Sequence, residues 1–348
     1  MKKIVTIILC SALVVISGCD NYDFAQEQFR KEVNLLSNSS LVYDRQVAEL
    51  QQGGDTLFVV ASLSGSQASD ESFTVALQNS DTLLRAYNKS NFDINKARFA
   101  KYLPEECYEF PTMEMTIPAG SSKAMFPVYL KNLDKISPDS IYFLEYKIDS
   151  LKTPDCNPKK RHVLLRIHKD NYYASTQTAT YYNYTSSTII IPNTDGTSEV
   201  RRPTNSNRVF PVSENSVRLM AGDESFSDYT TALDIINKGS IILEMGEQLP
   251  ENPLAKELTI LPYKDIDVMQ LTPIGEYDNT YLLNVIRTPD GRATYYKEFR
   301  LHYKYRLQPT DRYREVNAKL RYRPGAIAEA VSRNRTNSRP SANRFTRQ

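Results

Sequence analysis

The chain has 348 residues, a length that suggests about two domains. Its 41% hydrophobic and 24% charged residues lie in the ordinary range of globular proteins, which excludes wholesale disorder and a multi-span membrane protein. The 43 basic and 41 acidic residues leave a net charge of +2, too small for a dedicated nucleic-acid binder. Only three histidines and four cysteines occur, which offers few ligands for a catalytic transition metal.

The N-terminus has the features of a secretory signal that ends in a lipidated cysteine. Lys2 and Lys3 precede an apolar run from Ile4 to Ile16. At ~1.5 Å per residue this run spans about 20 Å, too short to cross a ~30 Å hydrocarbon core. The run leads to Cys19 through Ser-Gly, which resembles a bacterial lipobox, in which the cysteine becomes the acylated first residue. We predict lipid attachment, typically including palmitate, at Cys19; a plain signal peptide with a chance cysteine is the alternative.

Two cysteines remain after this processing, Cys107 and Cys156. In an oxidising envelope a disulfide between them would close a long loop, with a stabilisation of ~4 kcal/mol. Two isolated buried thiols are the other interpretation, and both stay open at this point.

Short strand-like segments separated by turn residues follow from about Leu41, a pattern typical of an antiparallel sandwich. One segment differs: Asp81–Tyr102 has helical spacing of its apolar residues and predicts a short helix or two in a crossover, capped by Ser80 or Asp81. The predicted strands are Leu57–Leu63, Ser72–Leu77, Glu114–Ile117, Ala124–Leu130, Ile141–Ile148 and Val163–Ile167.

The second half, after a polar stretch at Lys169–Thr178, is again rich in strand patterns. Within the predicted strand Thr294–Leu307, the alternation predicts one buried and one wet face. The buried face holds Phe299, Leu301, Tyr303, Tyr305 and Leu307, and the wet face holds Arg300, His302, Lys304 and Arg306. About eight strands without intervening helices fit an up-and-down barrel or a second sandwich equally well. The other predicted strands are Thr180–Ile191, Glu199–Arg202, Arg208–Val212, Ser216–Met220, Ser240–Met245, Glu257–Pro262, Val268–Leu271 and Thr280–Arg287.

The sequence therefore predicts an all-β protein: an antiparallel β-sandwich with a helical crossover, followed by an antiparallel β-barrel or second sandwich. The expected organisation is a signal peptide at 1–19, a linker at 20–32, the sandwich at 33–169, the second β-rich domain at 170–322 and a basic, disordered tail at 323–348.

Three blocks within Ser80–Ile148 carry a family resemblance: Asp81–Lys89, Tyr102–Tyr108 and Thr116–Gly120. They resemble the N-terminal Ig-like domain of Bacteroidota lipoproteins, which precedes either a glycosidase barrel or a non-catalytic lectin-like domain. The second half is similar, more loosely, to the β-rich domain found with it in proteins encoded beside starch-utilisation-type glycan importers. Asp20 and Asp23, directly after the cysteine, resemble the export signal of surface lipoproteins in the same phylum, although enterobacteria would treat Asp20 as a retention mark.

No catalytic constellation is evident. Asp265-Ile266-Asp267 is the nearest match to the carboxylate motif of the paired barrel glycosidases, and it lacks the proton donor. About 180 residues remain after the first domain, fewer than the ~200 to 250 that a (β/α)8 barrel requires. We predict no catalytic residues, no metal and no cofactor.

Tyrosines are the remaining candidates for a binding site, because a phenol offers a sugar both an apolar face and a hydrogen-bonding edge. Since neighbours on a strand point to opposite faces, at least one of Tyr181 and Tyr182 should leave the core. The alternative is that a chain without Trp packs its core with Tyr. The predicted carbohydrate-binding set is Tyr172, Tyr181, Tyr182, Tyr184 and Tyr295.

These features together predict a non-enzymatic lipoprotein of the outer membrane, exposed at the cell surface. Its expected partners are an oligosaccharide or polysaccharide, an importer complex and the membrane that holds the lipid anchor, with no nucleic acid. A structural or adhesive module that contacts protein partners is the alternative function.

Overall fold

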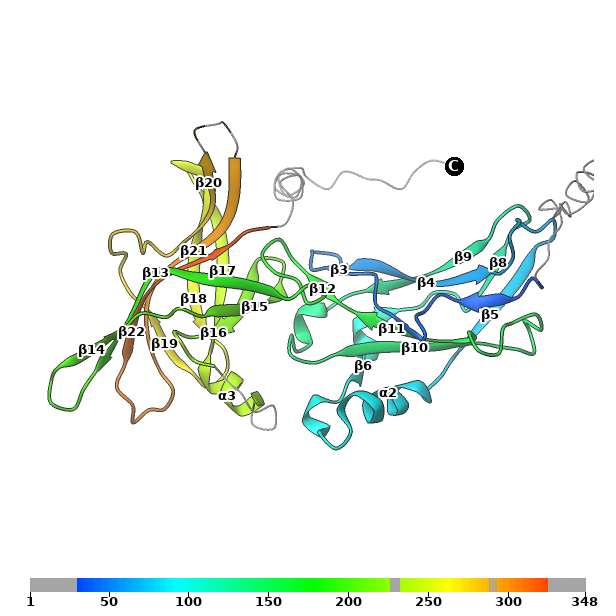
Figure 1. Cartoon of the computed structure of the whole chain (residues 1–348), viewed down its shortest axis with the longest axis horizontal. Helices are drawn as coiled ribbons and strands as arrows, with labels where there is room; N and C mark the ends of the chain where they lie inside the picture. The colour runs from blue at the N-terminus through cyan, green and yellow to red at the C-terminus, as the bar shows by residue number, and fades with distance from the viewer. Residues whose placement is uncertain (1–29, 226–231, 288, 290, 292, 325–348) are drawn as a thin grey trace, which may run out of the picture.

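The computed structural model describes residues 30–324 except 226–231, 288, 290 and 292. The predicted signal peptide with Cys19 and the basic tail from residue 325 onward lie outside the described residues. Figure 1 shows two lobes side by side, the first built from β1 to β12 and the second from β13 to β22. No helix in the described part of the chain is long and apolar enough to cross a membrane.

The first lobe is a sandwich of two sheets, as predicted. One sheet has the order β1-β4-β9-β7 and the other β2-β11-β10-β5-β8, with β6 beside β10; β3 and β12 form a separate pair. The strands are β1 (Val33–Leu35), β2 (Val42–Tyr43), β3 (Ala48–Glu49), β4 (Asp55–Leu63), β5 (Phe73–Asn79), β6 (Lys101–Tyr102), β7 (Tyr108–Glu109), β8 (Glu114–Ile117), β9 (Lys123–Leu130), β10 (Tyr142–Ile148), β11 (His162–Ile167) and β12 (Lys169–Asp170).

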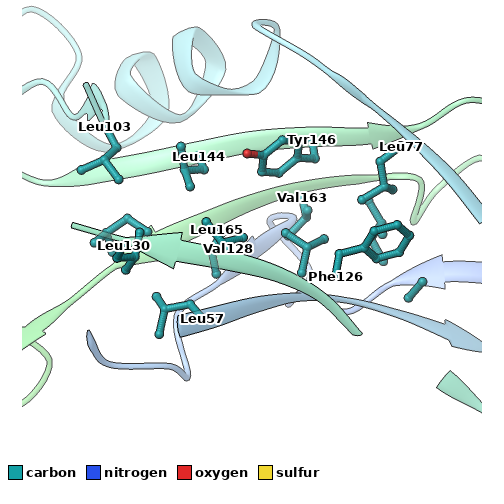
Figure 2. Close-up of a cluster of buried hydrophobic side chains, with 14 of the residues drawn as sticks. Leu57, Leu77, Leu103, Phe126, Val128, Leu130, Leu144, Tyr146, Val163 and Leu165 are labelled. Carbon is teal, nitrogen blue, oxygen red and sulfur yellow. The ribbon is translucent and has the colours of Figure 1, made fainter. Parts of the chain in front are cut away.

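The core of this lobe lies between its two sheets. Alternate residues of β4 and β9 are buried, such as Leu57 on β4 and Phe126 and Val128 on β9, and they meet Leu144 and Leu165 from the opposite sheet (Figure 2). Period-2 burial of this kind is what the sequence pattern predicted.

Strand β10 is buried on both faces because the helical crossover covers its outer side. Helix α2 (Leu83–Phe92) and the short helices η1 (Lys96–Arg98), η2 (Glu105–Cys107) and η3 (Leu133–Lys135) interrupt the strands of this lobe. Phe143 on β10 is completely buried and packs with Leu84 of α2.

The cap of α2 corrects the sequence prediction. Thr82, rather than Ser80 or Asp81, precedes the first turn, and its side chain forms no capping hydrogen bond. The carboxylate of Glu145 on β10 instead accepts the backbone N–H groups of Thr82, Leu83 and Leu84 at 2.9, 2.9 and 3.2 Å. Burial raises the pKa of Glu145, but hydrogen bonds, led by that from the Leu83 amide, outweigh it and lower the pKa.

The second lobe is a closed antiparallel barrel of eight strands, which decides between the two architectures that the sequence left open. The closing strand is β22, which pairs with β13 on one side and β21 on the other. The barrel strands are β13 (Thr180–Pro192), β15 (Ser206–Ser213), β16 (Ser216–Met220), β17 (Ser240–Leu249), β18 (Asn252–Pro262), β20 (Thr280–Arg287), β21 (Ala293–Arg306) and β22 (Arg314–Tyr322). Two further strands pair beside them: β14 (Ser198–Arg201) with β13, and β19 (Asp267–Gln270) with β21.

The sequence predicted no helix in this half, and α3 (Ala232–Gly239) corrects that expectation. Its buried residues include Ala232 and Ile236, which lie one turn apart on the face that packs on the protein.

Tyrosine side chains make up much of the barrel core. On β21 His302, predicted on the wet face, is buried because its ring nitrogens contact Thr272 and Glu315. The predicted buried face is confirmed: Phe299, Tyr303 and Tyr305 lie inside. Their hydroxyl groups find partners at the barrel end, since the Gly222 amide donates to Tyr303 at 2.8 Å and Tyr305 donates to Glu224 at 2.9 Å. Tyr is therefore a core residue at these positions, because the ring is buried and its polar tip is satisfied.

Candidate functional site

The two lobes are joined by a buried ion pair. Arg218 on β16 donates to Asp139, which lies in the loop before β10, at 2.5 Å. Only 2% of the Arg218 side chain and 9% of the Asp139 side chain are exposed. Burial raises the pKa of Asp139 and lowers that of Arg218, against their mutual attraction.

A second buried cation stands at the same junction. Lys169 on β12 donates through Nζ to the carbonyl oxygens of Leu133 and Ile136 at 3.1 and 3.0 Å, and burial lowers its pKa to about 8. The junction is consequently a packed, hydrogen-bonded unit rather than a bare linker.

A groove of about 630 Å³ opens beside β3 and β12. It lies within the range of roughly 300–1,000 Å³ that is usual for small-ligand sites. Tyr172 and Tyr322 supply aromatic rings to it, and the side chains of Arg45, Glu49 and Gln177 supply polar groups from the other lobe and from the connecting segment. We call this cavity the tyrosine groove.

Tyr172 is held firmly in the groove by its neighbours. Its ring meets those of Tyr173 and Tyr281 edge to face, with centroids 5.1 and 6.1 Å apart. The ammonium group of Lys297 lies 4.0 Å from the Tyr172 ring centroid and donates to the Tyr172 carbonyl oxygen. A rigid aromatic side chain loses little conformational freedom when a ligand binds against it.

The remaining predicted tyrosines do not join Tyr172 in one site. Tyr181 is 46% exposed on the outer face of β13, which confirms that one of the pair leaves the core. Tyr182 is completely buried inside the barrel and donates to the Tyr173 carbonyl at 3.0 Å, so the prediction that it contacts a glycan is wrong. Tyr184 is half-buried and bonded to Gly222, and Tyr295 lies on the β20–β21 hairpin opposite Val285.

The structure decides between the two interpretations of Cys107 and Cys156, because both are free, buried thiols and the possible disulfide is absent. Cys107 immediately precedes Tyr108, which pairs with Leu130 at the end of β9, whereas Cys156 pairs with Val33 near the start of β9. Eight residues of strand at about 3.3 Å each separate these ends by roughly 25 Å, far beyond the ~7 Å that a disulfide permits between Cα atoms.

The carboxylate in the motif nearest to a glycosidase signature is held by two donors. Asp267, in the motif nearest to a glycosidase signature, accepts hydrogen bonds from Tyr313 and Arg306, both at 2.7 Å. These bonds lower the pKa of Asp267, which is the opposite of what a proton donor requires. Nowhere in the described ranges do three His, Cys, Asp or Glu side chains gather as metal ligands.

A second cavity, of about 300 Å³, lies between the lobes. Its walls come from the end of α2, the loop before β10, strands β15 and β16, and α3. In Figure 1, α2 and α3 lie on the lower side of the molecule, while β3 lies on the upper side. The two cavities share no lining residue. We call this one the interlobe cavity. Sequence reasoning missed its arginines, because no short pattern reveals that Arg166 and Arg208 face the same space.

Comparisons with known proteins agree with this two-lobed architecture. A family model of an N-terminal domain matches residues 29–155, and a family model of a C-terminal domain matches residues 161–321. A search of curated proteins finds no match to the sequence.

Several solved structures have the same overall fold. A protein of unknown function from Bacteroides ovatus has a TM-score of 0.60 at 16% identity, covering 83% of this chain and 94% of that chain. Another from the same species has a TM-score of 0.58 at 17% identity, covering 84% and 92%. An auxiliary nutrient binding protein from Bacteroides thetaiotaomicron has a TM-score of 0.58 at 15% identity, covering 82% and 93%. The chain thus carries, in order, domains that match an N-terminal and a C-terminal family, in the fold of these Bacteroides proteins.

Proposed function

We propose that this protein is a non-catalytic outer-membrane lipoprotein that binds glycans at the cell surface for an importer complex, with the tyrosine groove as its binding site. The observation that carries the proposal is the groove itself, a preformed cavity of about 630 Å³ in which Tyr172 and Tyr322 stand beside polar side chains. Sugars present an apolar C–H face and a rim of hydroxyl groups, and this lining matches both.

The position of the groove also supports binding rather than turnover. Its walls come from both lobes, so the fixed junction holds the aromatic rings and the polar groups in one arrangement. Preorganisation of this kind favours affinity because little has to be ordered when the ligand enters.

The cellular setting rests on the N-terminal sequence and on the likeness to an auxiliary nutrient binding protein. An acylated Cys19 would anchor the two lobes to the outer membrane through residues 20–32, and the groove would then be available to polysaccharide outside the cell. Mass spectrometry of the mature protein should find acyl groups on an N-terminal cysteine; an unmodified mature N-terminus would contradict the anchor.

The binding test uses the mature protein in detergent and a panel of polysaccharides, by affinity gel electrophoresis and calorimetry. We expect retention by at least one glycan, weakened about fivefold to tenfold by Tyr172→Ala, since an aromatic contact contributes about 1 kcal/mol beyond its buried area. Tyr172→Phe should keep most of the affinity because it keeps the ring.

The matched control is Tyr295→Ala, which removes a half-buried tyrosine that does not line the tyrosine groove. It should leave binding unchanged. No retention by any glycan would contradict glycan binding, and loss of binding with Tyr295→Ala but not Tyr172→Ala would contradict the location. Capture of a surface protein without any dependence on sugar would favour the adhesive module instead.

A further inference from the structure

The interlobe cavity has a strong excess of positive charge. Five basic side chains line it, and Asp139 is its one acidic lining residue among those described. Arg218 forms an ion pair with Asp139, and Lys169 donates hydrogen bonds to two backbone carbonyl groups. The basic residues are Arg98, Arg166, Lys169, Arg208 and Arg218.

Two of these cations have no protein partner for their charge. Neither Arg166 nor Arg208 forms an ion pair or a side-chain hydrogen bond with any residue that the structure describes. Arg208 instead lies over Phe210, with its guanidinium carbon 4.5 Å from the ring centroid, and the same ring carries Arg218 at 4.5 Å. Arg208 and Arg218 lie over the same ring, and like charges this close repel one another, so an anion between the lobes would relieve that repulsion.

A third donor in the cavity wall also lacks a partner. Arg218 is almost fully buried, and its Nε has no hydrogen-bond acceptor among the described residues. A buried donor without an acceptor costs about 1–3 kcal/mol.

The rest of the lining suits an organic molecule better than a bare ion. Leu233 and Ile236 of α3 and Met220 of β16 contribute apolar side chains, and Ser137 and Ser140 of the loop before β10 contribute polar ones. At about 300 Å³ the cavity lies at the small end of ligand sites, too small for a polymer to pass through.

We propose that the interlobe cavity binds a sugar acid, a single uronic acid unit or the end of a chain that carries one. Its carboxylate is held by Arg166 and Arg208, its C–H face rests on the α3 wall, and its hydroxyl groups face the serines. The planar fork of a guanidinium group matches a carboxylate with two parallel hydrogen bonds. This site is separate from the tyrosine groove and goes beyond the function proposed above.

The test is calorimetry of the mature protein with glucuronic acid, galacturonic acid, glucose and inorganic sulfate as probes. We expect a uronic acid to bind at least about tenfold more tightly than glucose, because each hydrogen bond to a charged group contributes about a factor of ten. Binding should weaken as NaCl is raised. Arg208→Gln and Arg166→Gln should each weaken it about tenfold, and both should fold because these side chains are at least partly exposed.

Arg161→Gln is the matched control, because it removes the same charge from an exposed residue that does not line the cavity. It should leave binding unchanged, and so should Tyr172→Ala, which separates this site from the tyrosine groove. The proposal would be overturned by failure of both uronic acids to bind, by equal affinity for glucose, or by an equal loss with Arg161→Gln. Inorganic sulfate bound as tightly as a uronic acid would also overturn it, because the cavity would then recognise charge alone.

Discussion

The buried ion pair between Asp139 and Arg218 connects the two lobes. Its removal should lower the free energy of unfolding by an amount that the structure allows to be estimated. Arg218→Met would leave the Asp139 carboxylate almost fully buried and without its cationic partner. Breaking one side of a buried pair costs about 3–5 kcal/mol, since the remaining charge has neither water nor a partner. The Arg218 contacts to Phe210, and to Ser240 at 3.3 Å, would be lost as well.

Replacing both partners should cost far less than replacing one. Burial already raises the pKa of Asp139 and lowers that of Arg218, so the loss of water outweighs the attraction within the pair. A double variant, Asp139→Leu with Arg218→Met, should therefore come within about 1 kcal/mol of the natural protein.

The pH dependence of the single variant has a definite sign. A carboxyl group whose pKa is raised by folding destabilises the folded state once pH exceeds its unfolded pKa, and this penalty disappears at low pH when both states are protonated. Arg218→Met should accordingly lose most stability near neutral pH and less in acid.

The measurement is calorimetry together with urea unfolding followed by tyrosine fluorescence and circular dichroism, since the chain has no Trp. Both lobes must be followed, because two lobes need not unfold together. If the double variant were as unstable as the worse single variant, or if Arg218→Met had no effect, the reasoning about the buried pair would be refuted.

Three other predictions concern single features of the first lobe. Glu145→Ala should lower the free energy of unfolding by about 2 kcal/mol, because the backbone N–H groups at the start of α2 lose their acceptor; a change below about 0.5 kcal/mol in urea unfolding would contradict this. Burial lowers the pKa of His168 from 6.5 to about 4, so the unfolded state takes up a proton first, and stability should fall as pH drops from 6.5 towards 4. His168→Phe should remove that part of the acid sensitivity, and an unchanged slope in calorimetric scans would count against it. Because Cys107 and Cys156 are far apart, excess reductant should leave the melting temperature unchanged, and thiol reagents should modify both only after unfolding; a drop of several degrees on reduction would indicate a disulfide.

Much of the fold could be predicted from the sequence because its strands alternate so regularly. The predicted bounds of β8, β16 and β20 are those of the structure. The barrel itself could not be distinguished from a sandwich, because closure depends on β22, whose buried face holds only Val316, Ala318 and Leu320 between charged and polar residues. Such a pattern is a weak strand signal. The barrel closes because β22 pairs with β13, about 130 residues earlier in the chain, and local sequence patterns carry no information about such a distant pairing.

The site could be predicted only in part, for related reasons. Strand alternation predicts that Tyr181 and Tyr182 face opposite ways. Which of the two lies inside depends on how the barrel closes, and the structure buries Tyr182. The acceptor for α2 comes from Glu145, which is 63 residues beyond Thr82 in sequence. The interlobe cavity brings together residues of both lobes, and propensity or spacing carries no information about such contacts. Tyr172 lines a cavity, and its predicted contact with a glycan stays a prediction.

We propose above that this protein binds a glycan and does not change it. The most direct measurement incubates the purified mature protein with each glycan that it retains in affinity gels, and then analyses the glycan by mass spectrometry. We expect the protein to be retained by the glycan in the gel, and the glycan to be recovered at its original mass after prolonged incubation. Shortened or otherwise modified glycan, abolished by replacing a single carboxylate such as Asp267, would contradict it.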